Sequence, residues 1–214
     1  MKNLVFTLLV LLFFACEPAE KPNILIIGDS ISIGYTPFVK EALVDKAIVM
    51  HNKGNAQHTG TGLIKIEEWL GETDWDIIQF NWGLWDLAYR HTDAKTQGKR
   101  DKVNGTITFS VTEYAKNLET LVKILKEKSN AKLVFVTTSY VPEGEVGRFV
   151  EDAPKYNVAA LKIMKKHGVL VNDIYAKSKE IHAEHGTAPD NVHYTKSGSK
   201  ELAKLITDVL EREL

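Results

Sequence analysis

The sequence predicts an α/β fold in which a parallel sheet carries helices on both faces. Short apolar runs alternate with amphipathic stretches from residue 23 onward, and the connections between most of them are short. This alternation is typical of parallel strands joined by crossover helices. The apolar fraction of 44% and the charged fraction of 26% are those of a globular protein. A chain of 214 residues suits one domain with a sizeable core.

Five apolar runs predict five strands. The first run, Asn23 to Ile27, ends at Gly28 and has the continuous hydrophobicity of a strand that is buried on both faces. The predicted strands cover residues 23–27, 47–51, 75–81, 132–138 and 169–172.

Capping residues and apolar stripes predict the helices between these strands. Thr36-Pro37 is expected to open the first helix, since proline is favoured at the first helical position. Ser110 and Glu113 have the spacing of a capping box, and Gly71 and Gly168 are expected helix stops. The predicted helices cover residues 36–46, 61–70, 110–128, 154–167 and 197–214, with a further helix before residue 190.

Charge and cysteine content exclude several classes of protein. The 27 basic and 28 acidic residues nearly balance, whereas a nucleic-acid-binding domain carries a basic face. A single cysteine excludes an internal disulfide framework and a multi-cysteine zinc site. We therefore expect neither a nucleic-acid partner nor a multi-cysteine metal site. The serine chemistry described below needs no metal or organic cofactor, so we expect none.

The N-terminal residues are expected to be an export signal. The run from Leu4 to Phe14 is apolar except for Thr7, and it is too short to span a bilayer as a helix. Ala15-Cys16 follows and resembles a bacterial lipobox, which implies a signal peptide over residues 1–15 and a lipid on Cys16. The alternative is an ordinary secretory signal. Residues 16–22 are then a tether, residues 23–214 form the domain, and the protein is expected in the cell envelope, anchored to a membrane.

Chemically useful residues follow the predicted strands. Ligands bind beyond the carboxyl ends of parallel strands, where the sequence places Gly28-Asp29-Ser30, Asn52-Lys53-Gly54-Asn55, Asn81-Trp82 and, near the C-terminus, Asp190-Asn191-Val192-His193. A serine becomes nucleophilic when a histidine takes its proton and a carboxylate orients that histidine. Asp190 lies three residues before His193, which suits such a pair. Ser30 is the candidate nucleophile, or alternatively only a helix cap, and Asp29 is expected to be structural.

The Gly28-Asp29-Ser30 and Asp190-x-x-His193 motifs together resemble those of the GDSL/SGNH hydrolases over residues 23–214. This resemblance implies a flavodoxin-like three-layer α/β/α fold with a five-stranded parallel sheet. It also implies a catalytic triad of Ser30, His193 and Asp190. Gly54 matches the glycine of the second family block. The third block departs from the family, because Trp85 stands where the oxyanion asparagine belongs.

The transition state of such a reaction needs hydrogen-bond donors that face a developing oxyanion. We expect these from the Ser30 and Gly54 backbone N–H groups and from the side chain of Asn81. The alternative interpretation is that Gly54 is only a turn glycine and that Asn81 is only a hydrogen-bonded amide at the end of a strand.

Two long segments, residues 82–105 and 139–152, are expected to shape a substrate site. Trp82, Trp85 and Arg148 are candidate substrate-binding residues, although both segments also fit surface loops. His182 and His185 are expected on an exposed helical face rather than in a zinc site.

The expected activity is hydrolysis of small acyl esters, with acetate on carbohydrate as the substrate. The alternatives are acyl transfer on the same fold and a non-catalytic carbohydrate-binding lipoprotein.

Overall fold

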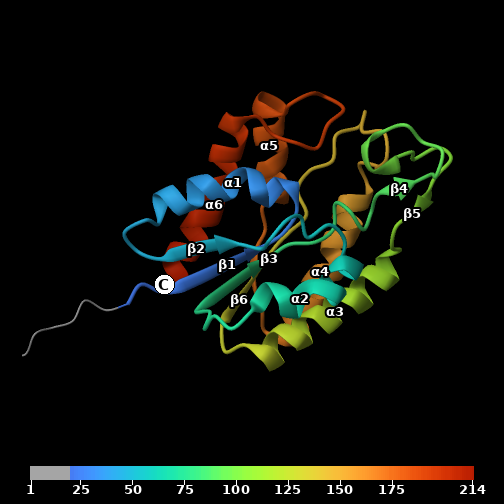
Figure 1. Ribbon diagram of the computed structural model, residues 1–214. Coiled ribbons are helices and arrows are strands. Elements are labelled where there is room, and N and C mark those ends of the chain that lie inside the picture. Colours follow the sequence, from blue (N-terminus) through green and yellow to red (C-terminus); the bar gives the residue numbers. More distant parts are fainter. Residues whose placement is uncertain (1–19) are drawn as a thin grey trace, which may run out of the picture.

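A computed structural model describes residues 20–214 and shows a central parallel sheet between two layers of helices (Figure 1). The five strands lie in the order β2-β1-β3-β6-β7. Their bounds are β1 Asn23–Ile27, β2 Ile48–His51, β3 Ile77–Phe80, β6 Lys132–Val136 and β7 Leu170–Asn172. The predicted α/β fold with a five-stranded parallel sheet is confirmed.

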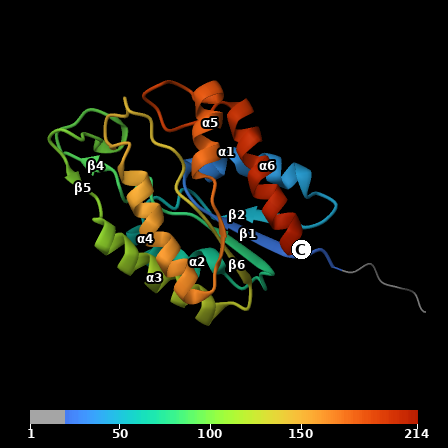
Figure 2. The same ribbon diagram turned by 180° about the vertical axis from the view of Figure 1, so that it is seen from behind.

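Among residues 20–214, three α-helices pack on each face of the sheet. Figure 2 shows the two helical layers from behind. One layer holds α1 (Ser30–Ala42), α5 (Tyr175–His185) and α6 (Lys196–Glu213), and the other holds α2 (Thr59–Leu70), α3 (Val111–Lys128) and α4 (Asp152–His167). Strands β1, β3 and β6 are almost entirely buried between these layers, as their continuous apolar runs require. Within residues 20–214, no helix has the length and hydrophobicity needed to cross a membrane.

Helix α1 begins six residues earlier than the sequence predicted. The Asp29 side chain accepts a hydrogen bond from the N–H of Ile31 at 2.9 Å and caps a helix whose first residue is Ser30. Pro37 therefore lies inside the helix rather than at its start. The prediction that Asp29 is structural is confirmed, and this cap fixes Ser30 at the junction between β1 and α1.

The two long segments of the sequence lie against each other. Residues 82–105 contain β4 (Tyr89–Arg90) and the short helix η1 (Gln97–Lys99), and β4 pairs with β5 (Thr106–Ile107). The N–H of Tyr89 donates to the carbonyl of Gly147 at 2.7 Å, and that of Lys102 donates to Val146 at 2.8 Å. These bonds join residues 82–105 to residues 139–152 into one wall at the carboxyl end of the sheet.

Asp86 fixes this wall to α2. Its Oδ1 accepts hydrogen bonds from the N–H of Thr59 at 2.9 Å and from the Thr59 hydroxyl at 2.5 Å. The carboxyl group is fully buried, and its Oδ2 has no hydrogen-bond partner among residues 20–214. Burial raises the pKa of Asp86 to about 7, although the hydrogen bonds from Thr59 oppose that rise.

The raised pKa predicts a pH-dependent loss of stability. The folded state holds this proton more tightly than the unfolded chain, whose aspartate pKa is about 3.9. The stabilisation is therefore complete below pH 4 and is lost as the pH rises through 7. Between pH 4 and pH 8, ionisation of Asp86 should therefore lower the free energy of unfolding by about 2–4 kcal/mol. Urea titrations of the wild type and Asp86→Asn at pH 4 and pH 8 measure the effect. A constant difference between the two proteins at both pH values would contradict it.

Candidate active site

The carboxyl edge of the sheet brings Ser30 and His193 together. Ser30 begins α1 directly after β1, and His193 lies on the loop between α5 and α6. The Oγ of Ser30 lies 2.9 Å from Nε2 of His193, although 163 residues separate the two in the chain. This is the distance at which a histidine accepts a serine proton. The structure thus joins the two residues that the sequence predicted as nucleophile and base.

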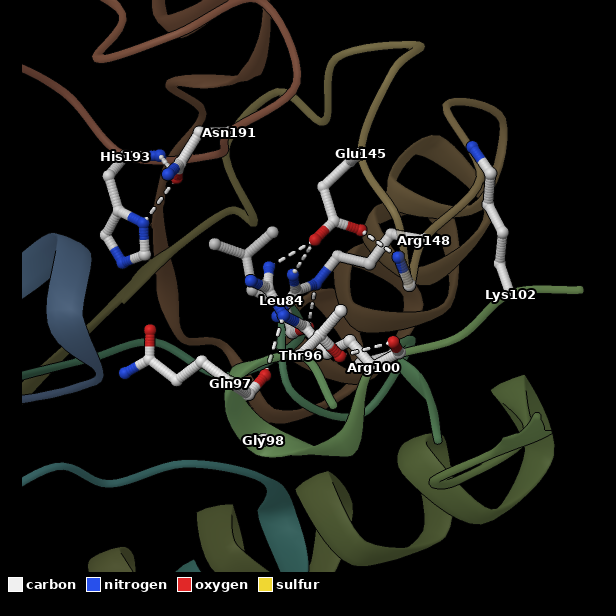
Figure 3. Close-up of polar contacts among 12 residues, drawn as sticks. Leu84, Thr96, Gln97, Gly98, Arg100, Lys102, Glu145, Arg148, Asn191 and His193 are labelled. Carbon is white, nitrogen blue, oxygen red and sulfur yellow. Dashed lines mark hydrogen bonds and ion pairs between the residues drawn. The ribbon is translucent and has the colours of Figure 1, made fainter. Parts of the chain in front are cut away.

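Asn191, rather than Asp190, orients the imidazole ring. Oδ1 of Asn191 lies 2.6 Å from Nδ1 of His193 (Figure 3), and it also accepts the backbone N–H of His193 at 3.0 Å. Because that N–H can only donate, Oδ1 is an acceptor and Nδ1 carries the proton. Nε2 is therefore unprotonated and faces the Ser30 hydroxyl. This tautomer is the one that a general base needs.

The prediction that Asp190 orients His193 is wrong. Asp190 is exposed and makes no hydrogen bond or ion pair among residues 20–214. The reason is local, because the turn from Asn191 to His193 presents the Asn191 amide to both nitrogen atoms on that side of His193. The spacing of the Asp-x-x-His motif does not indicate this role for Asn191, which lies within the motif itself.

Electrostatics favour the neutral form of His193. Partial burial lowers the pKa of His193, and the nearby guanidinium groups of Arg148 and Arg100 lower it further, whereas Glu145 raises it. A neutral imidazole is ready to accept a proton at neutral pH.

His182 supports the loop that carries His193. Its ring is buried between Tyr140 and Tyr194, and its Nε2 lies 2.6 Å from the carbonyl oxygen of Asn191. The expectation of an exposed face is therefore wrong for His182. The helical spacing did not reveal that the loop after α5 folds back over this side chain.

A small cavity opens beside Ser30 and His193, and its volume is about 100 Å³. Typical ligand pockets are several times larger, so this cavity suits a short acyl chain or another small group. Both long segments contribute to its lining, as the sequence predicted. The lining residues are Asp29, Ser30, Asn55, Leu84, Trp85, Arg90, Gln97, Gly98, Arg100, Arg148, Val192 and His193.

The predicted substrate residues divide into two groups. Trp85 and Arg148 line the cavity. Trp82 does not, because it is fully buried in the core, where its indole N–H donates to the carbonyl of Ala56 at 3.3 Å. A Cβ atom on Gly62 of α2 would lie 2.7 Å from the Trp82 ring, so the glycine makes room for this side chain. Trp82 is therefore a packing residue.

Of the three predicted oxyanion donors, Ser30 lines the cavity, whereas Gly54 and Asn81 do not. The Asn81 amide donates to the carbonyl of Val136 at 2.8 Å, and neither Asn81 nor Gly54 lines the cavity. Asn55 does line it, directly after Gly54. Its Oδ1 accepts the N–H of Gln57 at 2.8 Å, which leaves its Nδ2 as the available donor. The backbone N–H of Ser30 opens α1 and needs no partner within the helix. Ser30 and Asn55 are thus the better-placed donors.

Cys16 and the predicted signal peptide lie outside the described residues.

Comparisons with known proteins support the fold. No protein-family model and no curated protein matches the sequence. Solved structures with a similar fold include three esterases or lipases. The acetyl xylan esterase AlAXEase has 15% identity and a TM-score of 0.70, over 88% of this chain and 99% of its own. A lipase/acylhydrolase from Enterococcus faecalis has 19% identity and a TM-score of 0.69, over 90% and 97%. The acetylxylan esterase Axe2 from Geobacillus stearothermophilus has 19% identity and a TM-score of 0.64, over 90% and 93%. The chain therefore has the α/β fold of the SGNH hydrolases.

Proposed function

We propose that this protein is a serine esterase that hydrolyses small acyl esters. The observation that carries the proposal is the 2.9 Å contact between Ser30 Oγ and His193 Nε2 in the lining of a small cavity. The fold shared with esterases and lipases supports it.

The reaction would proceed through an acyl-enzyme. Ser30 Oγ attacks the ester carbonyl carbon while its proton moves to His193 Nε2. The N–H of Ser30 and the amide of Asn55 face the oxyanion that forms. The bond to the alcohol oxygen then breaks, and the imidazolium returns the proton to that oxygen. Water, deprotonated by His193, releases the acid in the same manner.

Acetate on carbohydrate is the substrate that we propose. The cavity is small enough to favour a short acyl group, and Trp85 in its wall offers an aromatic side chain for contact with a sugar. Two of the proteins with a similar fold are named as acetyl xylan esterases.

A fluorophosphonate probe tests the nucleophile. We expect one adduct per molecule, located by mass spectrometry on Ser30. The chain supplies an internal control, because Ser32 Oγ lies 2.7 Å from His51 Nε2 but is buried and donates to the carbonyl of Asp29. Labelling of Ser32, or no labelling at all, would argue against the proposal.

We also propose export and lipid attachment at Cys16. The support is the sequence alone, an apolar run followed by Ala15-Cys16 and a polar stretch. Mass spectrometry of the mature N-terminus should find a lipid-modified Cys16. Cleavage at another position, or an unmodified Cys16, would contradict this part of the proposal.

A further inference from the structure

Three arginines lie in the cavity beside the candidate nucleophile. Arg90 and Arg100 come from residues 82–105, and Arg148 comes from residues 139–152. We propose that the substrate is an anionic ester, whose carboxylate or sulfate group is bound by these arginines while Ser30 attacks its acyl group. This inference rests on the proposed esterase function and names the class of substrate.

Each guanidinium is fixed through two of its nitrogen atoms and leaves the third without a protein partner. Arg148 donates from Nε to the carbonyl of Leu84 at 2.6 Å and from Nη1 to Glu145 at 3.0 Å. Arg100 donates from Nε to the carbonyl of Gln97 at 3.0 Å and from Nη1 to the same Glu145 oxygen (Figure 3).

Arg90 has the same pattern with different partners. Its Nε donates to Thr108 at 3.0 Å, its Nη1 donates to the carbonyl of Gly98, and its guanidinium lies 4.8 Å from the centre of the Trp85 ring. Within residues 20–214, Nη2 of all three arginines makes no hydrogen bond to protein. Fixed guanidinium groups with free N–H donors match the oxygens of carboxylates and related anions.

The carboxylates present do not balance this positive charge. Glu145 is fully buried and pairs with both Arg100 and Arg148, while its other oxygen accepts the N–H of Gly147 at 2.7 Å. Glu145 lies behind the arginines and does not line the cavity, whereas Asp29 does line it, and burial raises the pKa of Asp29. Three arginines against these two acids leave a net charge of at least +1, and the lowered pKa of His193 favours its neutral form. Arg90 pairs with neither carboxylate.

Burying Arg148 and Glu145 beside the partly exposed Arg90 and Arg100 is costly unless the charges are compensated. Arg148 is only 4% exposed and Glu145 is fully buried. A purely structural role would be met by one arginine for one glutamate, whereas the cavity holds two further guanidinium groups. A bound anion would provide the missing compensation.

The reaction chemistry gives the anion a second effect. The field of Arg100 and Arg148 opposes formation of the His193 imidazolium, and Asn191 carries no charge to offset it. A substrate anion among the arginines would reduce this field when His193 becomes protonated. An anionic substrate would therefore assist the proton transfer as well as binding.

Binding to the full-length Ser30→Ala protein tests the inference without hydrolysis. Calorimetry would compare 4-acetoxybenzoate and 4-acetoxybenzenesulfonate with 4-acetoxybenzamide, a neutral ester of similar size. We expect at least one anionic ester to bind about tenfold more tightly than the amide, because charge-assisted hydrogen bonds are the stronger ones. The two anionic probes distinguish a carboxylate site from a site for sulfate, for which the sulfonate group stands in. The preference should decrease as salt increases.

Matched variants assign the preference to the arginines. Arg100→Gln and Arg90→Gln, each combined with Ser30→Ala, should reduce the preference to about twofold or less. Arg90→Gln breaks no ion pair with a carboxylate, so it keeps the test valid if Arg100→Gln fails to fold. Lys102→Gln is the control, since Lys102 donates to the carbonyl of Glu143 and points away from the cluster (Figure 3). The preference of the Lys102→Gln variant for the anionic esters over the amide should equal that of the parent Ser30→Ala protein.

Equal binding of the anionic esters and the amide, or a preference that survives both arginine substitutions, would overturn the inference. These results do not depend on turnover. Hydrolysis of 4-nitrophenyl acetate by the wild type, compared with Ser30→Ala, separately tests the proposed esterase function.

Discussion

Replacing Ser30 with alanine should lower the turnover of 4-nitrophenyl acetate by about 10,000-fold or to the uncatalysed rate. The substitution removes the only hydroxyl placed against His193 Nε2 among residues 20–214. His193→Ala should cause a comparable loss, because the hydroxyl then has no base to take its proton. The double variant should be hardly worse than either single one, since the two groups act as a unit. Initial rates under saturating substrate measure these effects.

His51→Gln provides the matched control for His193→Ala. His51 also places its Nε2 against a serine, Ser32, but that serine is buried and does not line the cavity. We expect turnover to stay within about threefold of the wild type, because this histidine contacts no reacting atom. An equal loss in His51→Gln and His193→Ala would show that the 2.9 Å contact has no special role.

Replacing Asn191 with alanine should lower kcat by about 100-fold or more. Its Oδ1 is the acceptor that fixes the His193 tautomer, and loss of the correct tautomer in a serine–histidine system is severely damaging. Asn191→Asp keeps the acceptor and adds a charge that stabilises the imidazolium, so it should retain or exceed wild-type kcat. Asp190→Asn should stay within about threefold, since Asp190 makes no contact with the ring within the described residues.

Circular dichroism of each variant separates this loss from unfolding, and a pH profile identifies its origin. Removal of the orienting group should change kcat and the pH dependence of kcat together, because both report the state of His193. A larger loss in Asp190→Asn than in Asn191→Ala would reverse the assignment and restore Asp190 as the orienting residue.

The sheet and the position of the nucleophile could be predicted from the sequence. Buried parallel strands are continuous apolar runs, so β1 was placed with its correct bounds, and the carboxyl-end rule then identified Ser30. The start of α1 was wrong because Thr36-Pro37 is a strong local signal. The cap by Asp29, which determines the helix start, depends on the turn after β1.

The orienting and oxyanion residues could not be predicted from the sequence, because spacing does not specify which way an amide points. Asn81 follows β3 as expected, yet its side chain turns to the Val136 carbonyl of the neighbouring strand. Asn55 and Asn191 each lie next to a residue that the sequence singled out. The Asn55 side chain is held by its hydrogen bond with Gln57, and the Asn191 side chain is held by its hydrogen bond with His193. These bonds form in two separate turns.

The arginine cluster is also not predictable from the sequence. Arg148 was singled out in the sequence, but Arg90 and Arg100 join it only because residues 82–105 fold back onto residues 139–152. Such non-local contacts leave no periodic signal in the chain.

The direction of β1 also determines which end of the domain would be nearer to an N-terminal membrane anchor. The described chain enters at Glu20 and runs through β1 from Asn23 to Ile27, so the entry point and the start of α1 at Ser30 lie at opposite ends of β1. Figure 1 shows this course of the chain. Five residues of extended chain separate those ends by about 17 Å. The last turn of α6 lies at the entry end, where Lys132 pairs with Glu213. If Cys16 carries a lipid, as we propose, the described chain would connect to that anchor at the end of β1 opposite to Ser30 and the cavity.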